Sequence, residues 1–408
     1  MHISQHVKDN IYWVGASDRR LALFENMFPL PGGVAYNSYL IMDDKVALVD
    51  SVDSAILQVF LENIDHVLSG RSIDYLIVNH MEPDHCDSID ILCSRFPDMK
   101  IVGNAKTFQI IRQFYNFDIE GRCHEVKEND TLCLGAHTLK FIFAPMVHWP
   151  EVMMTYDMTS KVLFSADAFG TFGALHGNLF ADELDFDGFF LDEARRYYTN
   201  IVGRYGQQVQ QALAKVSGLD IDMICPLHGP VWRKNLPNFI EKYDKWSRYE
   251  PEKSGVVIAY ASMYGNTENA AAVIAGRLSE RGVNDLRMYD VSKTHPSYII
   301  ADAFKYSHLI FASPTYNNGL YFAMHSLLHD MAVLNLRGRK VALVGNGSWA
   351  PVAHKVMEEM IGRMKDMTLL APPLVIHSSL KPCQMGEAIA LADAVADSVL
   401  ARIKEKNE

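Results

Sequence analysis

The pattern of apolar and polar positions along the chain changes near residue 250. Before that point, short apolar runs rich in β-branched and aromatic residues predict strands, and helical stretches are interleaved with them. This mixture is typical of two β-layers with helices on the outside. The predicted strands cover residues 34–42, 45–50, 75–80, 139–144, 161–165 and 223–226, and the predicted helices include 56–68 and 193–217.

After residue 255, strand-length apolar runs alternate strictly with helical stretches. Five short strands joined by helices are typical of a doubly wound parallel sheet. Between the halves, residues 249–255 lie in the stretch RYEPEKSG, whose Pro, Gly and alternating charges indicate a joint. We therefore predict two domains, residues 1–250 and 254–408. The strands of the second are predicted at 256–261, 286–290, 309–312, 341–345 and 374–376, with helices at 267–281, 323–331 and 352–364.

Composition narrows the class of protein. Hydrophobic residues make up 49% of the 408 residues and charged residues 21%, so both halves can bury a core. The apolar runs are too short to span a membrane, and the first segment, MHISQHVKDN, lacks the apolar stretch of a signal peptide. No two of the six cysteines have C-x-x-C spacing, which disfavours an internal rubredoxin or iron–sulfur site. We expect a cytoplasmic protein with reduced thiols.

The net charge of −11 is unevenly distributed. Residues 1–250 carry a net charge of −12, and residues 251–408 carry +1. Neither half has a run of Lys and Arg that could follow a phosphate backbone, so nucleic acid is not an expected partner. Part of the acidic excess of the first half lies in a segment with the residue types of a metal site.

That segment is NHMEPDH, which follows the apolar run DYLIV and supplies His80, Glu82, Asp84 and His85 within six residues. Three more candidates also come directly after predicted strands. If these strand ends meet at one edge of a sandwich, all seven side chains lie together. The further candidates are His148 after FIFAPMV, Asp167 after KVLFSA and His228 after DMICPL.

The set has the chemistry of a site for two divalent metals. Four histidines contribute neutral imidazoles, and three carboxylates with a bridging hydroxide balance the four positive charges. A carboxylate such as Asp167 can bridge both ions. Oxygen ligands mixed with imidazole suit iron or manganese, and zinc stays an alternative.

A second candidate site begins with the segment SMYGNT, between the predicted strand 256–261 and the helix that follows. Hydroxyls and a glycine at a helix N-terminus form a phosphate cradle, because free backbone N–H groups and the helix dipole face the anion. The segment resembles the phosphate loop of flavodoxins, and its lack of Lys and Arg fits a monophosphate. Its residues are Ser262, Met263, Tyr264, Gly265, Asn266 and Thr267.

Two more loops follow neighbouring strands at the edge where doubly wound sheets bind ligands. Tyr316 in the first and Trp349 in the second could lie against an isoalloxazine ring. The candidate residues are Ser313, Pro314, Thr315, Tyr316 and Asn317 in SPTYN, and Asn346, Gly347, Ser348 and Trp349 in GNGSW.

The metal motif resembles that of the metallo-β-lactamase superfamily, whose hydrolases carry H-x-H-x-D-H. Here Glu82 replaces the second histidine, which is typical of the flavo-diiron family. The resemblance covers essentially the whole chain and implies a metallo-β-lactamase-like αββα sandwich followed by a flavodoxin-like doubly wound parallel sheet. The third flavin loop departs from the family, which commonly has Gly-Ser-Tyr-Gly-Trp there. Further segments that resemble the flavo-diiron family are AYNSYLI, HWPEVMMTY, SADAFGTFG and HGPVWR.

The resemblance also implies cofactors and partners. It implies two irons and one FMN per chain, and reduction of O2 to water, of NO to N2O, or both. Electrons would come from rubredoxin or a similar small protein, and the chain would form a head-to-tail homodimer, alone or as a dimer of dimers. One iron would be held by His80, Glu82 and His148, the other by Asp84, His85 and His228, with Asp167 bridging.

Four aromatic or imidazole side chains are candidate neighbours of the irons, with ordinary core packing as the alternative: Trp149, Phe24, Tyr197 and His176. Two other functions stay open for the chain as a whole. One is a dizinc hydrolase with an appended flavodoxin domain, and the other is an electron carrier without catalysis. Metal content distinguishes the three, because they require iron, zinc or neither.

Overall fold

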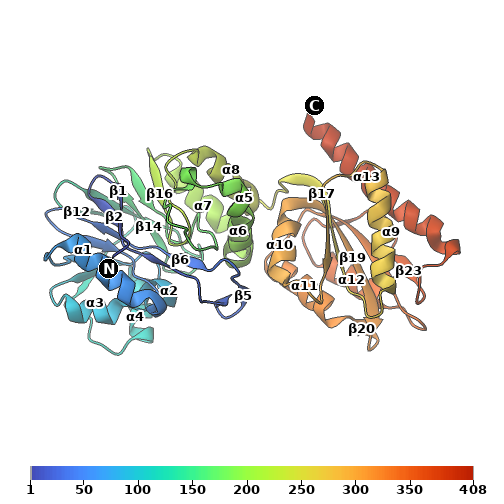
Figure 1. Cartoon of the computed structure of the whole chain (residues 1–408), viewed down its shortest axis with the longest axis horizontal. Helices are drawn as coiled ribbons and strands as arrows, with labels where there is room; N and C mark the ends of the chain where they lie inside the picture. The colour runs from blue at the N-terminus through green and yellow to red at the C-terminus, as the bar shows by residue number, and fades with distance from the viewer. Residues whose placement is uncertain (1, 408) are drawn as a thin grey trace. The chain divides into compact units, whose positions relative to one another are not determined.

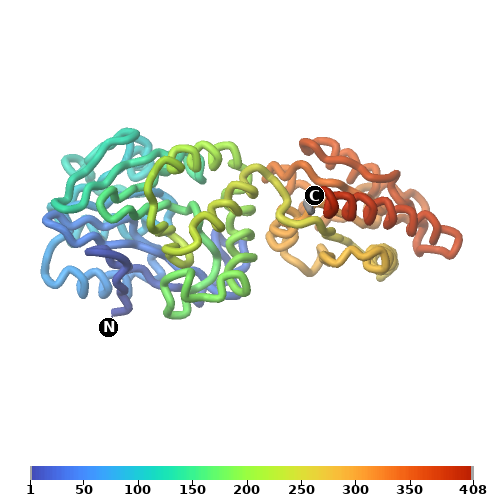
Figure 2. The backbone as a smooth tube through the Cα atoms, turned by 90° about the horizontal axis from the view of Figure 1, so that it is seen from above, coloured from blue at the N-terminus to red at the C-terminus, as the bar shows by residue number. Residues whose placement is uncertain are grey.

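The computed structural model describes residues 2–407, which form two compact units. Within the described residues, the first consists of 2–198 with 205–244, and the second of 199–204 with 245–407. The colours of Figures 1 and 2 follow the chain from the first unit, in blue and green, into the second, in yellow to red.

The first unit is a sandwich of two sheets. The seven-stranded sheet has the order β1-β2-β7-β8-β9-β10-β11, and the five-stranded sheet has the order β12-β13-β14-β15-β16. The strands are β1 (Gln5–Lys8), β2 (Ile11–Trp13), β7 (Tyr39–Ile41), β8 (Ala47–Val49), β9 (Tyr75–Ile77), β10 (Lys100–Gly103), β11 (Cys123–Glu125), β12 (Thr131–Cys133), β13 (Thr138–Phe143), β14 (Met153–Asp157), β15 (Val162–Phe164) and β16 (Met223–Cys225).

The core of this unit lies between the two sheets. Ile41 and Ile77 from one sheet and Phe141 and Val162 from the other belong to a single buried apolar cluster. Helices lie outside the sheets, so the layers are those of an αββα sandwich (Figure 1). The helices are α1 (Leu57–Leu68), α2 (Pro83–Cys86), α3 (Ile89–Arg95), α4 (Ala105–Phe114), α5 (Phe186–Phe189), α6 (Leu191–Tyr197), α7 (Gly206–Val216) and α8 (Leu236–Ser247).

The second unit is a parallel sheet with the order β18-β17-β19-β21, completed by β22 and β23, which both pair with β21. β17 alternates between two cores, because successive side chains of a strand point to opposite faces. Val257 and Ala259 belong to a cluster with residues of α10, α11 and α12, whereas Val256 and Ile258 belong to one with residues of α9 and α13. This is the predicted doubly wound architecture.

The elements of the second unit are β17 (Lys253–Tyr260), α9 (Asn266–Glu280), β18 (Leu286–Asp290), α10 (Pro296–Lys305), β19 (Tyr306–Tyr316), β20 (Gly319–Leu320), α11 (Phe322–Val333), β21 (Lys340–Asn346), α12 (Ala353–Gly362), β22 (Thr368–Leu369), β23 (Leu374–Ile376) and α13 (Met385–Asn407). Among the described residues, no helix combines the length and the apolar character needed to cross a membrane. The long helix α13, for instance, carries several acidic and basic side chains.

One predicted strand, residues 34–42, was wrong in extent. The chain forms β6 (Val34–Tyr36), which pairs with β3 (Ala16–Asp18), and then β7, which joins the seven-stranded sheet. Between them, the Asn37 amide N–H donates to Leu227 O at 2.8 Å and its side chain donates to two further carbonyls at 2.9 Å. These long-range bonds interrupt the ladder, which an apolar pattern cannot reveal.

The predicted helix at residues 193–217 was also wrong, because it is broken. α6 is followed by a π-helical turn, Tyr198–Val202, and a 3₁₀ turn, Gly203–Tyr205, before α7 begins. The segment Thr199–Arg204 belongs to the second unit, where Asn200 Nδ2 donates to Ser297 O at 3.2 Å and Tyr249 Oη donates to Gly203 O at 2.8 Å. Tertiary contacts therefore override the helical pattern.

Candidate metal centre and flavin site

The first ligands are arranged by a change from extended to helical backbone. His80 lies shortly after β9, and Glu82 has an extended backbone with φ −66° and ψ 140°. Pro83 then begins α2, where its fixed φ favours the first turn of a helix. Asp84 and His85 follow in that turn, and all four ligand candidates are buried. The spacing of the motif thus turns four side chains toward one interior.

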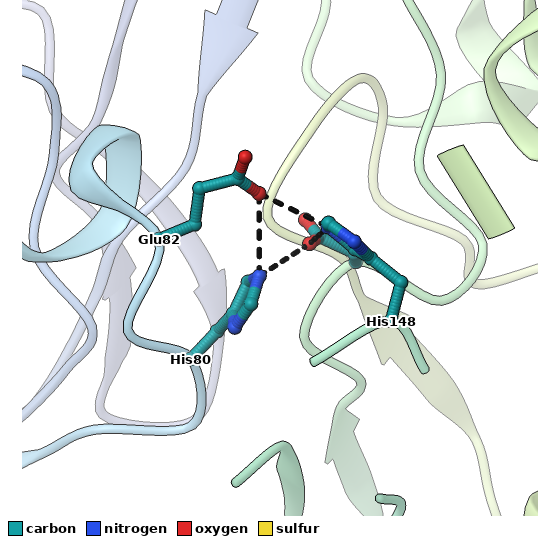
Figure 3. Close-up of side chains that lie close together, drawn as sticks. His80, Glu82 and His148 are labelled. Atoms are coloured by element: carbon teal, nitrogen blue, oxygen red, sulfur yellow. Dashed lines mark hydrogen bonds and ion pairs between the residues drawn. The ribbon is translucent and has the colours of Figure 1, made fainter. Parts of the chain in front are cut away.

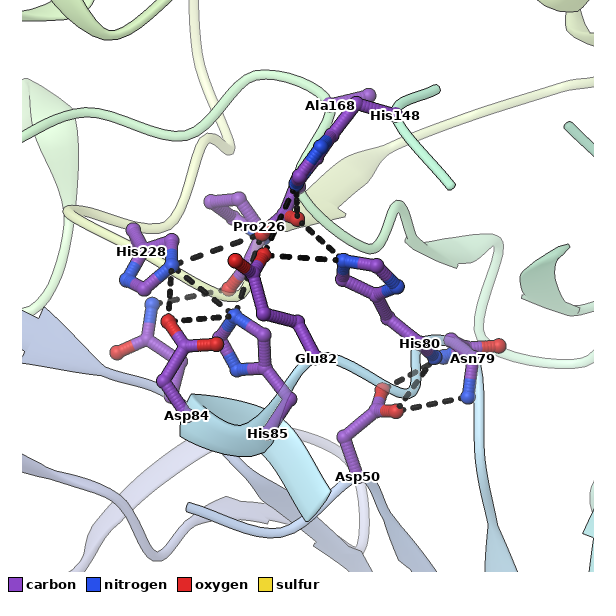
Figure 4. A network of polar contacts seen from close by, with 12 residues as sticks. Asp50, Asn79, His80, Glu82, Asp84, His85, His148, Ala168, Pro226 and His228 are labelled. Atoms are coloured by element: carbon purple, nitrogen blue, oxygen red, sulfur yellow. Dashed lines mark hydrogen bonds and ion pairs between the residues drawn. The ribbon is translucent and has the colours of Figure 1, made fainter. Parts of the chain in front are cut away.

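A first group of candidates gathers around the carboxylate of Glu82. Its Oε2 lies 3.3 Å from His80 Nε2 and 3.0 Å from His148 Nε2 (Figure 3). A second group gathers around Asp84, whose Oδ2 lies 3.3 Å from the Nε2 atoms of both His85 and His228 (Figure 4). The ligand atoms within each group lie within 4.8 Å of one another.

Asp167 faces both groups. Its Oδ2 lies 3.1 Å from His80 Nε2 and 3.2 Å from His148 Nε2. Its Oδ1 lies 3.3 Å from His85 Nε2 and 3.5 Å from His228 Nε2. One oxygen toward each group is the arrangement of a carboxylate that bridges two metals, so the structure brings all seven predicted ligands together in the two expected sets.

The protonation of two histidines shows that this centre fits metal ions. His80 Nδ1 lies 2.8 Å from Glu151 Oε1, and His228 Nδ1 lies 2.8 Å from the carbonyl oxygen of Ala35. Both oxygens accept hydrogen bonds, so each Nδ1 carries a proton, and loss of the Nε2 proton would leave a lone pair on Nε2 that can bind a metal ion. In the described chain, the ion pairs of the three carboxylates are all to histidines, so no Lys or Arg competes with a metal cation.

The field of these carboxylates is strong enough to shift pKa values. Burial alone lowers the pKa of His148, yet Asp167 and Glu82 raise it to about 9. Conversely, burial alone raises the pKa of Asp167, but the positive charge of His80 and hydrogen bonds from the histidines hold it well below its usual value. A site that attracts protons this strongly also attracts metal cations.

The flavin loops lie at the predicted edge of the second unit. Gly265 has φ +84°, a conformation that favours glycine, and α9 begins immediately after it. Thr267 is buried in the first turn of α9, whereas Tyr264 is 90% exposed. Ser262 Oγ is buried and has no hydrogen-bond partner in the described chain. A free hydroxyl beside a helix N-terminus fits a bound phosphate group.

The other two loops differ in how their side chains are used. Thr315 Oγ1 accepts hydrogen bonds from the backbone N–H groups of Val352 and Ala353 at 2.9 and 3.1 Å, so it ties down the start of α12. Asn317 has φ +49° in the turn between β19 and β20. Tyr316 is 36% exposed and Trp349 is 89% exposed, so both aromatic faces are available to a ring.

Comparison with known proteins gives the family. Residues 34–229 match the model of the ODP family beta lactamase, and residues 258–368 match the flavodoxin model. An anaerobic nitric oxide reductase flavorubredoxin from Vibrio vulnificus is 33% identical over 84% of this chain and 70% of its own length. A nitric oxide reductase from Moorella thermoacetica is 32% identical over 90% and 91%. The chain belongs to the flavodiiron protein family.

Solved structures agree with this assignment. The rubredoxin oxygen:oxidoreductase of Desulfovibrio gigas matches with a TM-score of 0.91 and 28% identity, covering 98% of this chain and 99% of that one. The flavodiiron protein of Giardia intestinalis matches with a TM-score of 0.90 and 25% identity, covering 98% of both. The predicted fold is confirmed. As in its family, this flavodiiron chain has FMN and a diiron centre as its cofactors.

Three of the four predicted neighbours lie at the diiron centre. The ring centroid of Trp149 is 5.4 Å from that of His80. Phe24 and Tyr197 lie 5.3 and 5.4 Å from His228. His176 does not join them: it is exposed and lines a separate cavity of about 490 Å³ whose walls contain none of the seven ligands.

Sequence reasoning missed the groups that hold the ligands of this flavodiiron centre. Besides Glu151, the buried carboxylate of Asp50 accepts hydrogen bonds from the backbone N–H groups of Asn79 and His80 at 2.7 and 3.3 Å. Burial raises the pKa of Asp50 to about 6. Glu151 carries a sequence signal, because it follows His148 in the same loop, whereas Asp50 is distant in sequence and only the parallel pairing of β8 with β9 brings it near.

Proposed function

We propose that this protein reduces O2 to water, NO to N2O, or both, using electrons that pass from an external redox protein through FMN to the diiron centre. The observation that carries the proposal is Asp167, with one oxygen toward each of two ligand groups, in a chain that also contains a flavin cradle. Relatives named for both activities support it: nitric oxide reductases and a rubredoxin oxygen:oxidoreductase.

The roles of the residues follow from their contacts. When bound, iron would supply one-electron redox chemistry, and FMN would link one- and two-electron steps. His80, Glu82, His148, Asp84, His85, His228 and Asp167 would hold the metals. Glu151 and the carbonyl of Ala35 fix the rings of His80 and His228. The hydroxyl of Tyr197 is buried without a hydrogen-bond partner in the described chain, so it can donate to a small polar ligand at the centre.

Metal content and gas consumption test the proposal. Protein expressed under iron-replete, anaerobic conditions is expected to contain two irons and one FMN per chain and to consume O2 or NO once reduced. A dizinc hydrolase would contain zinc, and an electron carrier would contain no metal. Zinc in the site together with no gas consumption after iron reconstitution would exclude the reductase. Rapid mixing of the reduced protein with each gas measures which one it prefers.

The electron donor is proposed to be rubredoxin or a related small redox protein. The six cysteines are all free thiols in the described chain and none forms a C-x-x-C pair, so this chain offers no rubredoxin-type iron site of its own. Free thiols also fit the proposed cytoplasmic location. Fast reduction of the FMN by NADH alone, without a protein donor, would contradict this part of the proposal.

We also propose a head-to-tail homodimer, alone or paired into a dimer of dimers, in which the FMN of one chain faces the irons of the other. Large apolar side chains are exposed at the flavin edge: Tyr264 at 90% and Trp349 at 89% in loops, and Phe322 at 69% at the start of α11. Such a concentration of exposed aromatic surface is expected where another molecule binds. Sedimentation velocity of the holoprotein tests the assembly, and a monomer at micromolar concentration would contradict it.

A further inference from the structure

Asn346, at the C-terminal end of β21, connects two loops of the flavin site. Its side chain is buried, with 6% of its surface exposed. Its Nδ2 lies 3.1 Å from Thr267 Oγ1, in the first turn of α9, and 2.9 Å from the carbonyl oxygen of Ser378. The side chain therefore joins the phosphate loop, the third flavin loop and the segment after β23.

The direction of these hydrogen bonds is fixed by chemistry. The carbonyl oxygen of Ser378 can only accept, so the amide group of Asn346 must direct its NH2 toward it. The second hydrogen of the same NH2 is then donated to Thr267 Oγ1. Because the Thr267 oxygen is occupied as an acceptor, its own hydrogen is left to be donated elsewhere, and the free N–H groups of α9 begin at the same turn.

The partner segment of Asn346 is itself held in place. Ser378 has φ +67°, and its Oγ donates to Ser348 Oγ at 2.9 Å. The backbone N–H of Gly347 donates to Ile376 O at 3.1 Å. Asn346 is thus anchored on the side away from Thr267, and it is held through its NH2 because its buried Oδ1 has no hydrogen-bond partner in the described chain.

We propose that Asn346 is a positioning residue for the FMN phosphate, and that it holds the Thr267 hydroxyl as a donor toward the phosphate cradle. The sequence alone placed Asn346 among possible ring contacts, whereas its hydrogen bonds connect it to the phosphate loop. A residue that acts in this way contributes to the binding of FMN but not to that of riboflavin, which has the same ring and ribityl chain and no phosphate. The inference rests on FMN as the cofactor.

The test compares the two flavins. The FMN-depleted protein is titrated with FMN and with riboflavin, and binding is followed by the quenching of flavin fluorescence. Asn346→Ala is expected to weaken FMN about tenfold, the effect of one hydrogen bond to a charged group, and to change riboflavin less than twofold. Asn284→Ala, in an exposed loop, serves as the control and should change neither. Equal loss of both flavins, or no loss of FMN, would overturn the proposal.

A double-mutant cycle shows whether Asn346 acts through Thr267. Thr267→Val removes the hydroxyl and keeps the shape, and adding Asn346→Ala to it should then cost little more FMN affinity. Additive losses would mean that Asn346 has only an independent structural role, and would contradict the proposal. If Asn346→Ala does not fold, Asn346→Leu replaces it in both experiments, since it has a similar shape and loses the NH2 without adding a charge. Failure of the wild type to bind either flavin would overturn the cofactor assignment and this inference with it.

Discussion

At the scale of single residues, two of the candidate ligands of the diiron centre depend on a second group. His80 and His228 turn Nε2 toward the centre because Glu151 and the carbonyl oxygen of Ala35 accept hydrogen bonds from their Nδ1–H groups. Asp167 contributes in another way, because each of its oxygens faces a different ligand group. Replacing a supporting group should therefore affect metal binding differently from replacing Asp167.

Asp167→Ala is expected to abolish gas reduction and to lower iron occupancy at both positions, because one carboxylate serves both ligand groups. FMN should stay bound, since the flavin loops belong to the other unit. Iron per chain is measured by inductively coupled plasma mass spectrometry, and flavin by absorbance. Thr267→Ala is the complementary variant and should weaken FMN while sparing iron. Normal iron content and turnover in Asp167→Ala would show that the carboxylate does not bridge.

Glu151→Ala should weaken metal binding more gently, by about 10- to 100-fold, the usual effect of removing the group that orients a ligand histidine. Chelator competition under anaerobic conditions measures this affinity. Glu128→Ala is the matched control, because Glu128 is on the surface and pairs with Lys215. Glu151→Gln retains an acceptor oxygen and should lie between Glu151→Ala and the wild type. Equal metal affinities in Glu151→Ala, Glu151→Gln and the wild type would contradict the role of Glu151 in orienting His80.

At the scale of elements, polar pairs fix the ends of strands that an apolar core alone would not align. His137, in the turn between β12 and β13, lies 2.7 Å from Asp157 at the end of β14, and both side chains are buried. The hydrogen bond with Asp157 raises the pKa of His137. A histidine whose pKa is higher in the folded state stabilises that state most when it is protonated.

The stabilisation by this pair should therefore depend on pH. It is fully present below the ordinary histidine pKa of about 6.5, and it is lost as pH rises through the higher value of the folded state. Thermal unfolding of the wild type and of His137→Gln should differ more at pH 5.5 than at pH 9, in the transition of the first unit. His124→Gln, at an exposed strand position, is the control. A difference in thermal stability between the wild type and His137→Gln that grows with pH would contradict the stabilising role of the His137–Asp157 pair.

At the scale of the whole molecule, the question is whether FMN and irons cooperate within a chain or between chains. His228→Ala removes a competent iron site and Thr267→Ala, stripped of FMN if necessary, removes the flavin. When the two variants are dissociated and reassembled together, about half of the dimers are mixed, and each mixed dimer has one working pair of two. Transfer between chains then predicts about a quarter of wild-type activity. An inactive mixture with verified mixed dimers would exclude the head-to-tail model.

The sequence by itself determined which residues are candidates for the two sites. Each metal ligand follows an apolar run that ends as a strand, and the phosphate loop lies between a strand and a helix, so short-range pattern was enough to find them. The same pattern gave a wrong prediction where a contact with residues far away in sequence determines the backbone conformation. The strand at residues 34–42 is divided by the bonds of Asn37, and the helix at residues 193–217 is broken where Thr199–Arg204 joins the second unit.

Tertiary structure decided how those residues are grouped and what supports them. β9 belongs to one sheet, whereas β15 and β16 belong to the other, so only the stacking of two sheets brings His80 to Asp167 and His228. The stacking also places Glu151 beside His80, while the pairing of β8 with β9 brings Asp50 near, and His176 lines a separate cavity. In the second unit, the packing of its own elements brings Asn346 to Thr267. These relations depend on contacts between residues far apart in sequence, and such contacts are fixed by sheet register and core packing and leave no trace in local periodicity.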